Sequence, residues 1–249
     1  MQIVNIKNIE FGKGKPKICV PIMGSNINEL EKEINGLDGL MYDVVEWRMD
    51  YYDFDNIDAL LQAVHFIHNK LKKGLLLATF RTSNEGGVKE ISDEQYRIIN
   101  EAIILSGNID LVDIEYFRER QVVQSLLTLA HENNVCVIMS NHDFEKTPSY
   151  EQMINRLDGM HEMGADIAKL AVMPNDEDDV FTLLKATNDC SSKPIITMSM
   201  GKIGLISRLT GEIYGSCMTF GCADKASAPG QINANELNTV LDVIHNADK

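Results

Sequence analysis

The chain alternates short apolar runs with longer segments in which apolar residues recur every three or four positions. Runs of this length are typical of buried strands, and they occupy residues 16–22, 43–50, 74–81, 110–116, 136–143, 165–172, 194–200 and 215–221. The segments between them have helical spacing, as Leu60, Val64 and Leu71 illustrate. The pattern therefore predicts a series of parallel βα units, in which each strand is followed by a helix.

Three of the predicted helices begin with a recognisable cap. Asn26 and Asn56 stand directly before helical segments, where a side-chain oxygen can accept from a free backbone N–H group. Ser92 and Gln95 have the spacing of a capping box. These signals mark the starts of the helices that follow the first three strands.

Eight βα units in 249 residues indicate an α/β fold of the closed (β/α)8 type, the TIM barrel, with one domain over residues 1–249. The alternative is an open doubly wound sheet. It is disfavoured because neither a GxGxxG nor a GxxxxGK[ST] motif follows an early strand. The first fifteen residues precede the first barrel strand, and we expect them to form a hairpin around Gly12 and Gly14.

Charge and composition narrow the choice of partners and compartment. The net charge is −14, from 23 Lys plus Arg against 37 Asp plus Glu. Binding to nucleic acid or to an anionic membrane needs a basic patch, so neither partner is expected. The apolar runs are too short to span a bilayer. Five cysteines without a visible signal peptide indicate reduced thiols in a cytoplasmic protein.

Most of the predicted strands combine an apolar face with a face that carries charge. In residues 43–50, for example, Val45 and Trp47 share one face, and Glu46 and Arg48 share the other. The apolar face of a barrel strand packs under the helices, so the polar face must point into the lumen. The ionisable residues placed there are Glu46, Arg48, Arg81, Asp113, Glu115, His142 and Lys169.

Burying so many charges costs roughly several kcal/mol per ion unless they are paired. Most of them lie in the later half of their strands, the end at which barrel enzymes place catalysis. The cluster therefore favours an active site over a purely structural plug of salt bridges.

Lys169 is the most informative of these residues, because it lies in mid-strand among apolar neighbours. Desolvation and the nearby arginines disfavour its charged form and expose an amine that can form a Schiff base with a ketone or aldehyde. His142, on the neighbouring strand, is a candidate for the acid–base steps. The alternatives are a structural pairing of Lys169 with Asp113 or Glu115, and a His142 that has no chemical role.

Two later segments carry candidate ligand-binding groups. Arg208 follows the seventh strand and is suited to a bidentate clamp on a carboxylate. The sequence KASAPGQI (225–232) follows the eighth strand; its small residues, with Ser227 and Gln231, are typical of a mobile lid over a ligand. Taken alone, either segment is equally compatible with an ordinary surface loop.

Together these residues resemble the type I 3-dehydroquinate dehydratase family. The matching stretches are EWRMD (46–50), TFR (79–81) with Glu85, DIE (113–115), SNHDF (140–144), AKLAVMP (168–174), MSMGKIGLISR (198–208), GSCMTFG (215–221) and KASAPGQI (225–232). The resemblance covers nearly the whole chain in order. It implies a (β/α)8 barrel, commonly a homodimer, that needs neither metal nor organic cofactor. The implied reaction is the syn dehydration of 3-dehydroquinate to 3-dehydroshikimate in the shikimate pathway, which leads to chorismate and the aromatic amino acids.

The resemblance also implies a role for each matching residue. Lys169 would form the imine, His142 would be the general acid–base group, and Glu85 would lie near the departing C1 hydroxyl. The substrate-binding residues would be Glu46, Arg48 and Arg81 at the ring hydroxyls, Arg208, Ser227 and Gln231 at the carboxylate, and Met198, Met200 and Phe220 along the ring. One departure is Pro21, where some relatives carry Ser; it removes a hydroxyl but touches no chemical step.

Two other functions compete with this one. A Schiff-base aldolase or transaldolase would use a similar lysine and, for sugar phosphates, a phosphate site near strands seven and eight. Arg208 beside the Ser–Gln lid could be mistaken for such a site. A metal-binding or redox-sensing protein would use Cys217, Cys222 and His142. That set is a poor zinc signature, because a C-x4-C spacing lacks a second pair.

Overall fold

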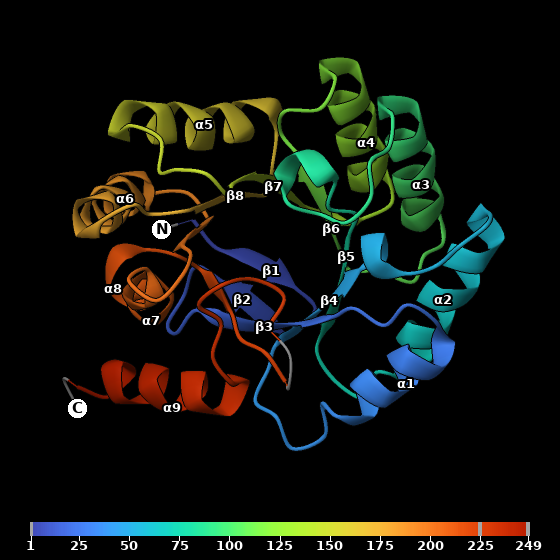
Figure 1. Ribbon diagram of the computed structural model, residues 1–249, viewed down its shortest axis with the longest axis horizontal. Coiled ribbons are helices and arrows are strands. Elements are labelled where there is room, and N and C mark those ends of the chain that lie inside the picture. Colours follow the sequence, from blue (N-terminus) through green and yellow to red (C-terminus); the bar gives the residue numbers. More distant parts are fainter. Residues whose placement is uncertain (1, 224–225, 248–249) are drawn as a thin grey trace.

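The computed structural model describes residues 2–223 and 226–247 (Figure 1). Within them, eight parallel strands form one sheet in the order β10-β3-β4-β5-β6-β7-β8-β9. Their bounds are β3 Lys17–Ile22, β4 Val44–Arg48, β5 Leu75–Thr79, β6 Leu111–Glu115, β7 Cys136–Asp143, β8 Ile167–Val172, β9 Ile195–Ser199 and β10 Met218–Phe220. A parallel bridge between Ile195 and Ser216 closes the ring. The prediction of a TIM barrel is confirmed.

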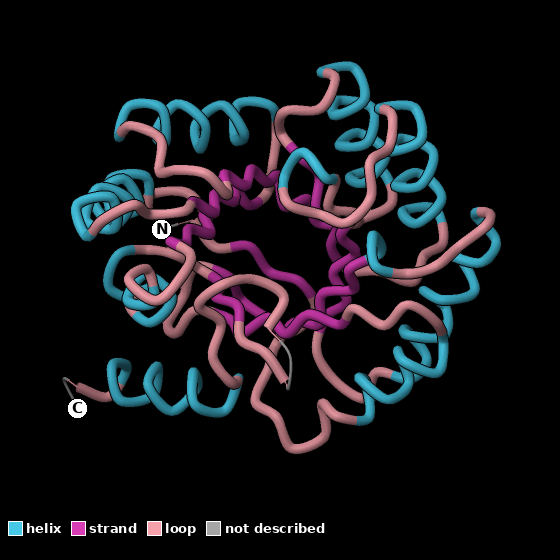
Figure 2. The backbone as a smooth tube through the Cα atoms, in the orientation of Figure 1, coloured by secondary structure: helices cyan, strands magenta, loops and turns pink. Residues whose placement is uncertain are grey.

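Helices surround this ring of strands (Figure 2). They are α1 Ile27–Asn35, α2 Ile57–Lys70, α3 Asp93–Leu105, α4 Arg120–Glu132, α5 Tyr150–Met163, α6 Glu177–Cys190, α7 Leu205–Leu209, α8 Gly211–Tyr214 and α9 Ala234–His245, with short 3-10 turns η1 Met49–Tyr51 and η2 Ser83–Glu85. Asn26 and Asn56 cap α1 and α2, and Ser92 with Gln95 forms the predicted capping box of α3. None of the described helices has the length and apolar character needed to span a membrane.

Side-chain alternation along the strands divides the interior into two apolar cores. The larger core lies between the sheet and the helices and includes Trp47, Met49 and Tyr96. The second core fills the lumen and includes Val44, Leu77, Leu111, Ile138 and Ile167. The charged faces of the strands therefore point into the barrel above this second core, as the alternation predicts.

The N-terminal hairpin closes one end of the barrel. Strands β1 (Val4–Ile6) and β2 (Ile9–Phe11) pair antiparallel, and the ring of Phe11 is fully buried in the lumen core. The hairpin was expected, but its turn is at Lys7 and Asn8, not around Gly12 and Gly14. Lys7 adopts a positive φ of 52° there, and the two glycines lie after β2, where the chain turns toward β3.

Phe11 gives a test of this closure. Replacing a buried phenylalanine with alanine leaves a cavity, so Phe11→Ala should lower the free energy of unfolding by about 3–5 kcal/mol. Because the ring lies at the end of the lumen away from the charged groups, kcat/KM of the folded variant should stay near the wild-type value. Denaturant titration measures the first quantity. Ile3→Ala, at a position 42% exposed, is the control and should change stability by less than about 0.5 kcal/mol. Equal losses in both variants would show that the hairpin does not seal the lumen.

Candidate active site

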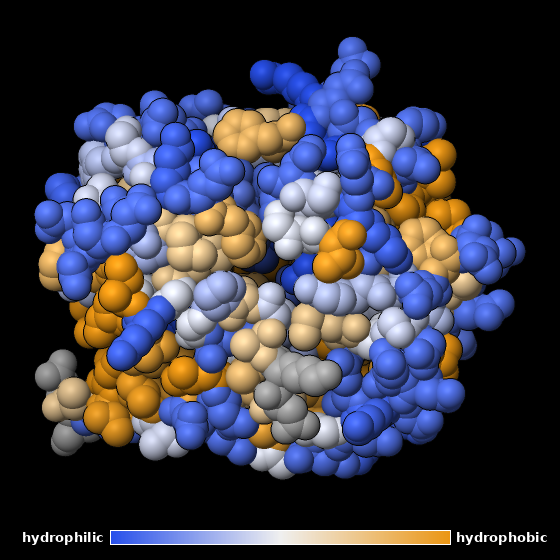
Figure 3. All heavy atoms as spheres, viewed as in Figure 1, coloured by the Kyte–Doolittle hydropathy of each residue, from blue (hydrophilic) through white to orange (hydrophobic). Residues whose placement is uncertain are grey.

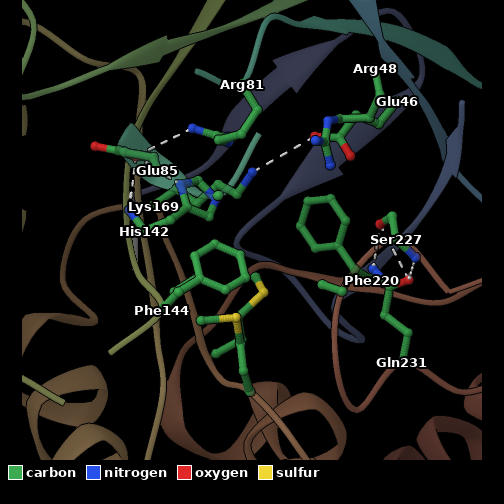
Figure 4. Close-up of a pocket in the computed structure, with 15 residues that line it drawn as sticks. Glu46, Arg48, Arg81, Glu85, His142, Phe144, Lys169, Phe220, Ser227 and Gln231 are labelled. Carbon is green, nitrogen blue, oxygen red and sulfur yellow. Dashed lines mark hydrogen bonds and ion pairs between the residues drawn. The ribbon is translucent and has the colours of Figure 1, made fainter. Parts of the chain in front are cut away.

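A pocket opens at the C-terminal ends of the barrel strands. It is visible in Figure 3 as a hollow with hydrophilic atoms in its depth. Its lining comes from β4, β7, β8, β9 and β10, from the loop after β5 and from the segments that follow β7, β9 and β10. The residues are Glu46, Arg48, Arg81, Glu85, Gly86, His142, Phe144, Lys169, Ala171, Met198, Met200, Phe220, Ser227, Ala228 and Gln231 (Figure 4). Eleven of the twelve residues predicted for the site therefore share one pocket.

Lys169 projects from the middle of β8 and is 2% exposed. Its Nζ atom donates a 2.9 Å hydrogen bond to Asp113 and lies 3.8 Å from Glu46. The same atom lies over the ring of Phe220, 4.7 Å from the centroid. The nearest charges are thus carboxylates and not the arginines expected from the sequence, because β4 and β6 direct their acidic residues toward the barrel axis. The pairing with Asp113, which the sequence left open, is present.

Arg81 links this lysine to the rest of the charged cluster. Its Nη2 donates twice to Asp113 at 3.1 Å, and its Nη1 lies 3.3 Å from Glu115 and 3.4 Å from Glu85. Burial alone would raise the pKa of Asp113. The cations Arg81 and Lys169 outweigh burial and, with the hydroxyl of Ser140, hold that pKa below its usual value.

The cluster contains more acids than bases. The cations are Arg48, Arg81 and Lys169, and the carboxylates paired with them are Glu46, Asp50, Glu85, Asp113 and Glu115. Three positive charges therefore face five acidic groups. An excess of acids in a dry site makes at least one of them hard to ionise.

Glu85 is the acid in this cluster whose pKa is raised. It ends η2 in the loop after β5 and is 6% exposed. Burial, opposed by Arg81, raises its pKa to about 7. Its carboxylate accepts from the backbone N–H of His142 at 2.9 Å and lies 3.0 Å from the Nδ1 atom of that residue. Burial first, and then the cations Arg81, Lys169 and Arg48, hold the pKa of His142 well below 6.5. The two side chains form a pair that can share and pass a proton.

Arg48 is held by Asp50, a residue for which the sequence suggested no role. The Nε and Nη2 atoms of Arg48 donate to Asp50 at 2.8 and 2.7 Å. This clamp uses two of the three guanidinium nitrogens and leaves Nη1 for a ligand. Asp50 also accepts from the backbone N–H groups of Arg81 and Val88, so that it connects Arg48 with the loop that carries Glu85.

Arg208 is the one predicted site residue that does not line the pocket. It lies on α7, is 1% exposed, and donates to the backbone oxygen of Pro229 at 3.0 Å and to the sulfur of Met198 at 3.5 Å. Among the described residues no carboxylate is recorded as its partner, and its Nε has no hydrogen-bond partner. Burial lowers its pKa to about 10. A buried cation without a counter-ion is a strong site for an anion.

The segment after β10 forms the remaining wall. Ser227 and Gln231 bind each other, since the backbone N–H of Ser227 donates to the Gln231 side chain at 2.8 Å. Lys225, at the start of the predicted loop, lies outside the described residues. Pro21 lies on β3 but lines a neighbouring cavity with Tyr51 and Ala223 and not this pocket.

Sequence reasoning missed several residues that shape the site: Asp50, Gly86, Phe144, Ala171 and Ala228. Asp50 is in the EWRMD stretch and Phe144 in SNHDF, so both lay within recognised motifs without an assigned role. The carboxylates and thiols form no metal site: among the described residues, no group of three or more His, Cys, Asp or Glu side chains is arranged to hold a metal ion. All five cysteines are free thiols.

A TIM barrel with a charged pocket at the C-terminal ends of its strands defines the protein as a barrel enzyme. Comparison with known proteins makes this specific. The family model described as type I 3-dehydroquinase matches residues 18–248, and the chain belongs to this family. Its reaction class is that of a hydro-lyase, and this membership favours the resemblance noted above over an aldolase.

Related proteins match this chain over nearly its whole length. A 3-dehydroquinate dehydratase of Listeria monocytogenes is 50% identical, covering 98% of this chain and 99% of the relative, and one of Clostridium novyi is 46% identical with 99% coverage of both. Among solved structures, a type I 3-dehydroquinate dehydratase of Clostridium difficile with covalently modified comenic acid has a TM-score of 0.95 and 45% identity, over 99% of each chain.

The raised pKa of Glu85 predicts a pH dependence. Its carboxyl has a pKa of about 7 in the folded chain against 4.5 as an isolated group. The folded chain then binds the proton more tightly, so the contribution to stability is full below pH 4.5 and is lost as the pH rises to about 7. That interval corresponds to about 3 kcal/mol.

Two measurements check this prediction. Carbon-13 NMR of labelled glutamates should show one carboxyl, absent from Glu85→Gln, with a midpoint near pH 7. The unfolding free energy of the wild type should fall between pH 4.5 and 7 by more than that of Glu85→Gln, with the exposed Glu90→Gln as control. A Glu85 midpoint below pH 5 would contradict the assignment.

Proposed function

We propose that this enzyme converts 3-dehydroquinate to 3-dehydroshikimate by syn dehydration, through an imine between Lys169 and the substrate. The observation that carries the proposal is the position of the Lys169 amine, buried in the pocket between two carboxylates and the face of Phe220. The covalently modified comenic acid in the structure of the Clostridium difficile relative is consistent with covalent chemistry in such an enzyme.

The first step exchanges a ketone oxygen for the lysine nitrogen. The ammonium of Lys169 and the C3 ketone give an iminium and one water, so the nitrogen carries a positive charge before and after the step. Asp113 and Glu46 face that charge throughout. The iminium then withdraws electrons from C2, which makes the C2 proton acidic.

Glu85 and His142 together carry out the proton transfers. His142, held largely neutral by its surroundings, takes the C2 proton, and the electron pair left behind gives an enamine. The enamine expels the C1 hydroxyl, which leaves as water with a proton from the pair. A second water hydrolyses the conjugated iminium, restores the ammonium of Lys169 and releases the product. Because the iminium is the electron sink, these steps require neither a metal nor an organic cofactor.

The remaining pocket residues fit the parts of the substrate. Glu46, Arg48 and Arg81 provide the charged and hydrogen-bonding groups for the ring hydroxyls, and Met198, Met200 and Phe220 provide an apolar wall. The carboxylate would pair with the guanidinium of Arg208, with Ser227 and Gln231 beside it. Arg208 lies behind Met198 and the Pro229 carbonyl, so this pairing needs a local shift of one of them.

The family resemblance extends the proposal to the setting of the enzyme. We propose a cytoplasmic homodimer, each chain of which is one domain, that acts in the shikimate pathway. Sedimentation of the purified protein would check the dimer.

Lys169 provides the direct test of the imine. Borohydride added with 3-dehydroquinate should reduce the C=N bond, inactivate the enzyme and leave one ring-sized adduct on the peptide that contains Lys169. Borohydride alone should do neither, and Lys169→Ala should abolish both labelling and turnover. The exposed Lys202→Ala serves as the matched control and should label normally. An adduct on any other lysine, or a Lys169→Ala enzyme of normal speed, would disprove the mechanism.

Arg208 tests the carboxylate site. A desolvated guanidinium–carboxylate pair contributes about 2–5 kcal/mol, so Arg208→Ala should raise KM at least tenfold. Arg208→Lys keeps the charge but loses the bidentate guanidinium, so its KM should lie between that of Arg208→Ala and that of the wild type. Arg120→Ala, an exposed substitution, is the control. Steady-state kinetics measure the effect, and an unchanged KM in Arg208→Ala would remove this residue from the binding site.

A further inference from the structure

Phe144 and Gly86 meet at the rim of the pocket. A Cβ atom built on Gly86 would come within 2.3 Å of the Phe144 ring, so the ring rests directly on the glycine backbone. Gly86 has a φ of +82° and directly follows Glu85. Phe144 follows His142 by two residues. The Glu85–His142 pair and the Gly86–Phe144 contact therefore join the same two segments, the loop after β5 and the end of β7.

The exposures of these residues change sharply across the contact. The side chains of Glu85 and His142 are 7% and 10% exposed, whereas Phe144 is 38% exposed. Figure 4 shows the ring of Phe144 beside His142 at the edge of the pocket. The ring thus borders both solvent and the pocket that the ionisable pair lines. Any side chain on residue 86 would prevent this position, and glycine also suits the positive φ.

We infer that Phe144 is a positioning residue whose ring, seated on Gly86, keeps water away from the Glu85–His142 pair and so sets the pH range in which the pair transfers protons. The inference rests on the proposed function for its catalytic meaning. The screening itself is a property of the free enzyme, because it concerns only the pair and the ring.

Charged groups surround the pair on several sides. The charged groups that face it are Arg81 from the loop after β5, Glu115 from β6, Lys169 from β8 and Arg48 from β4. Asn141 donates to Glu85 at 3.1 Å. These groups are unchanged by a substitution at Phe144. A change in the titration of the pair would then report the access of water. Burial is the largest cause of the shifts of both Glu85 and His142, which agrees with this view.

The test compares Phe144→Ala with Phe144→Leu. Nitrogen-15 NMR of labelled histidines, with His142 assigned by His142→Gln, should show the midpoint of His142 rising by about one pH unit in Phe144→Ala, or about tenfold in protonation. Phe144→Leu keeps an apolar cover and should stay near the wild type. The acid limb of the kcat profile should move to higher pH by the same amount in Phe144→Ala. Phe181→Ala, at an exposed ring on α6, is the control.

Gly86→Ala approaches the contact from the other side. As a single substitution it should displace the ring and raise the pH midpoint of the His142 titration. Combined with Phe144→Ala, it should add no further shift. An unchanged His142 midpoint in Phe144→Ala, or an equal shift in Phe144→Leu, would overturn the inference. Since the histidine titration needs no substrate, it stands apart from the imine at Lys169, whose failure in borohydride trapping would refute the proposed function instead.

Discussion

The feature on which the structure depends is the burial of paired charges inside the barrel. Each of these ions would be costly to remove from water if it stood alone, so the lumen tolerates them only as a network. Arg81 is central to it, because one guanidinium contacts carboxylates on β6 and in the loop after β5. The network in turn requires strands in fixed register, with their acidic residues turned toward one axis. A barrel supplies that register without a free edge.

Much of this organisation could be predicted from the sequence, because it depends on local periodicity. Alternation placed Glu46, Asp113 and Lys169 on inward faces, and the side chains of Asn26 and Asn56 identified helix starts that the structure confirms. The hairpin turn was misplaced for an equally local reason. Lys7 adopts a left-handed conformation although it is not glycine, so the turn lacks the usual sequence signal. The prediction was instead based on Gly12 and Gly14, which lie after the hairpin.

The features that could not be predicted depend on which side chains meet in three dimensions. The sequence placed Arg208 near the ligand, but only the packing of α7 shows it behind Met198. Asp50 ends the recognised EWRMD stretch, yet its clamp on Arg48 depends on the rotamers of both residues. The contact of Phe144 with Gly86 joins positions far apart in sequence. Periodicity reports the face on which a residue lies, and it carries no information about the partner across that face.

The closed floor made by Phe11 has a consequence for the traffic of small molecules. Because an apolar core fills the lumen and the hairpin covers its far end, ligands and water reach the pocket only from the C-terminal ends of the strands. Under the proposed mechanism one turnover releases two waters and consumes one. During these steps the substrate ring occupies the pocket and is for most of the time bound covalently to Lys169. This geometry then sets the order of events. The expelled water must leave past the covalently bound substrate ring, and the product can leave only after another water has entered and hydrolysed the imine.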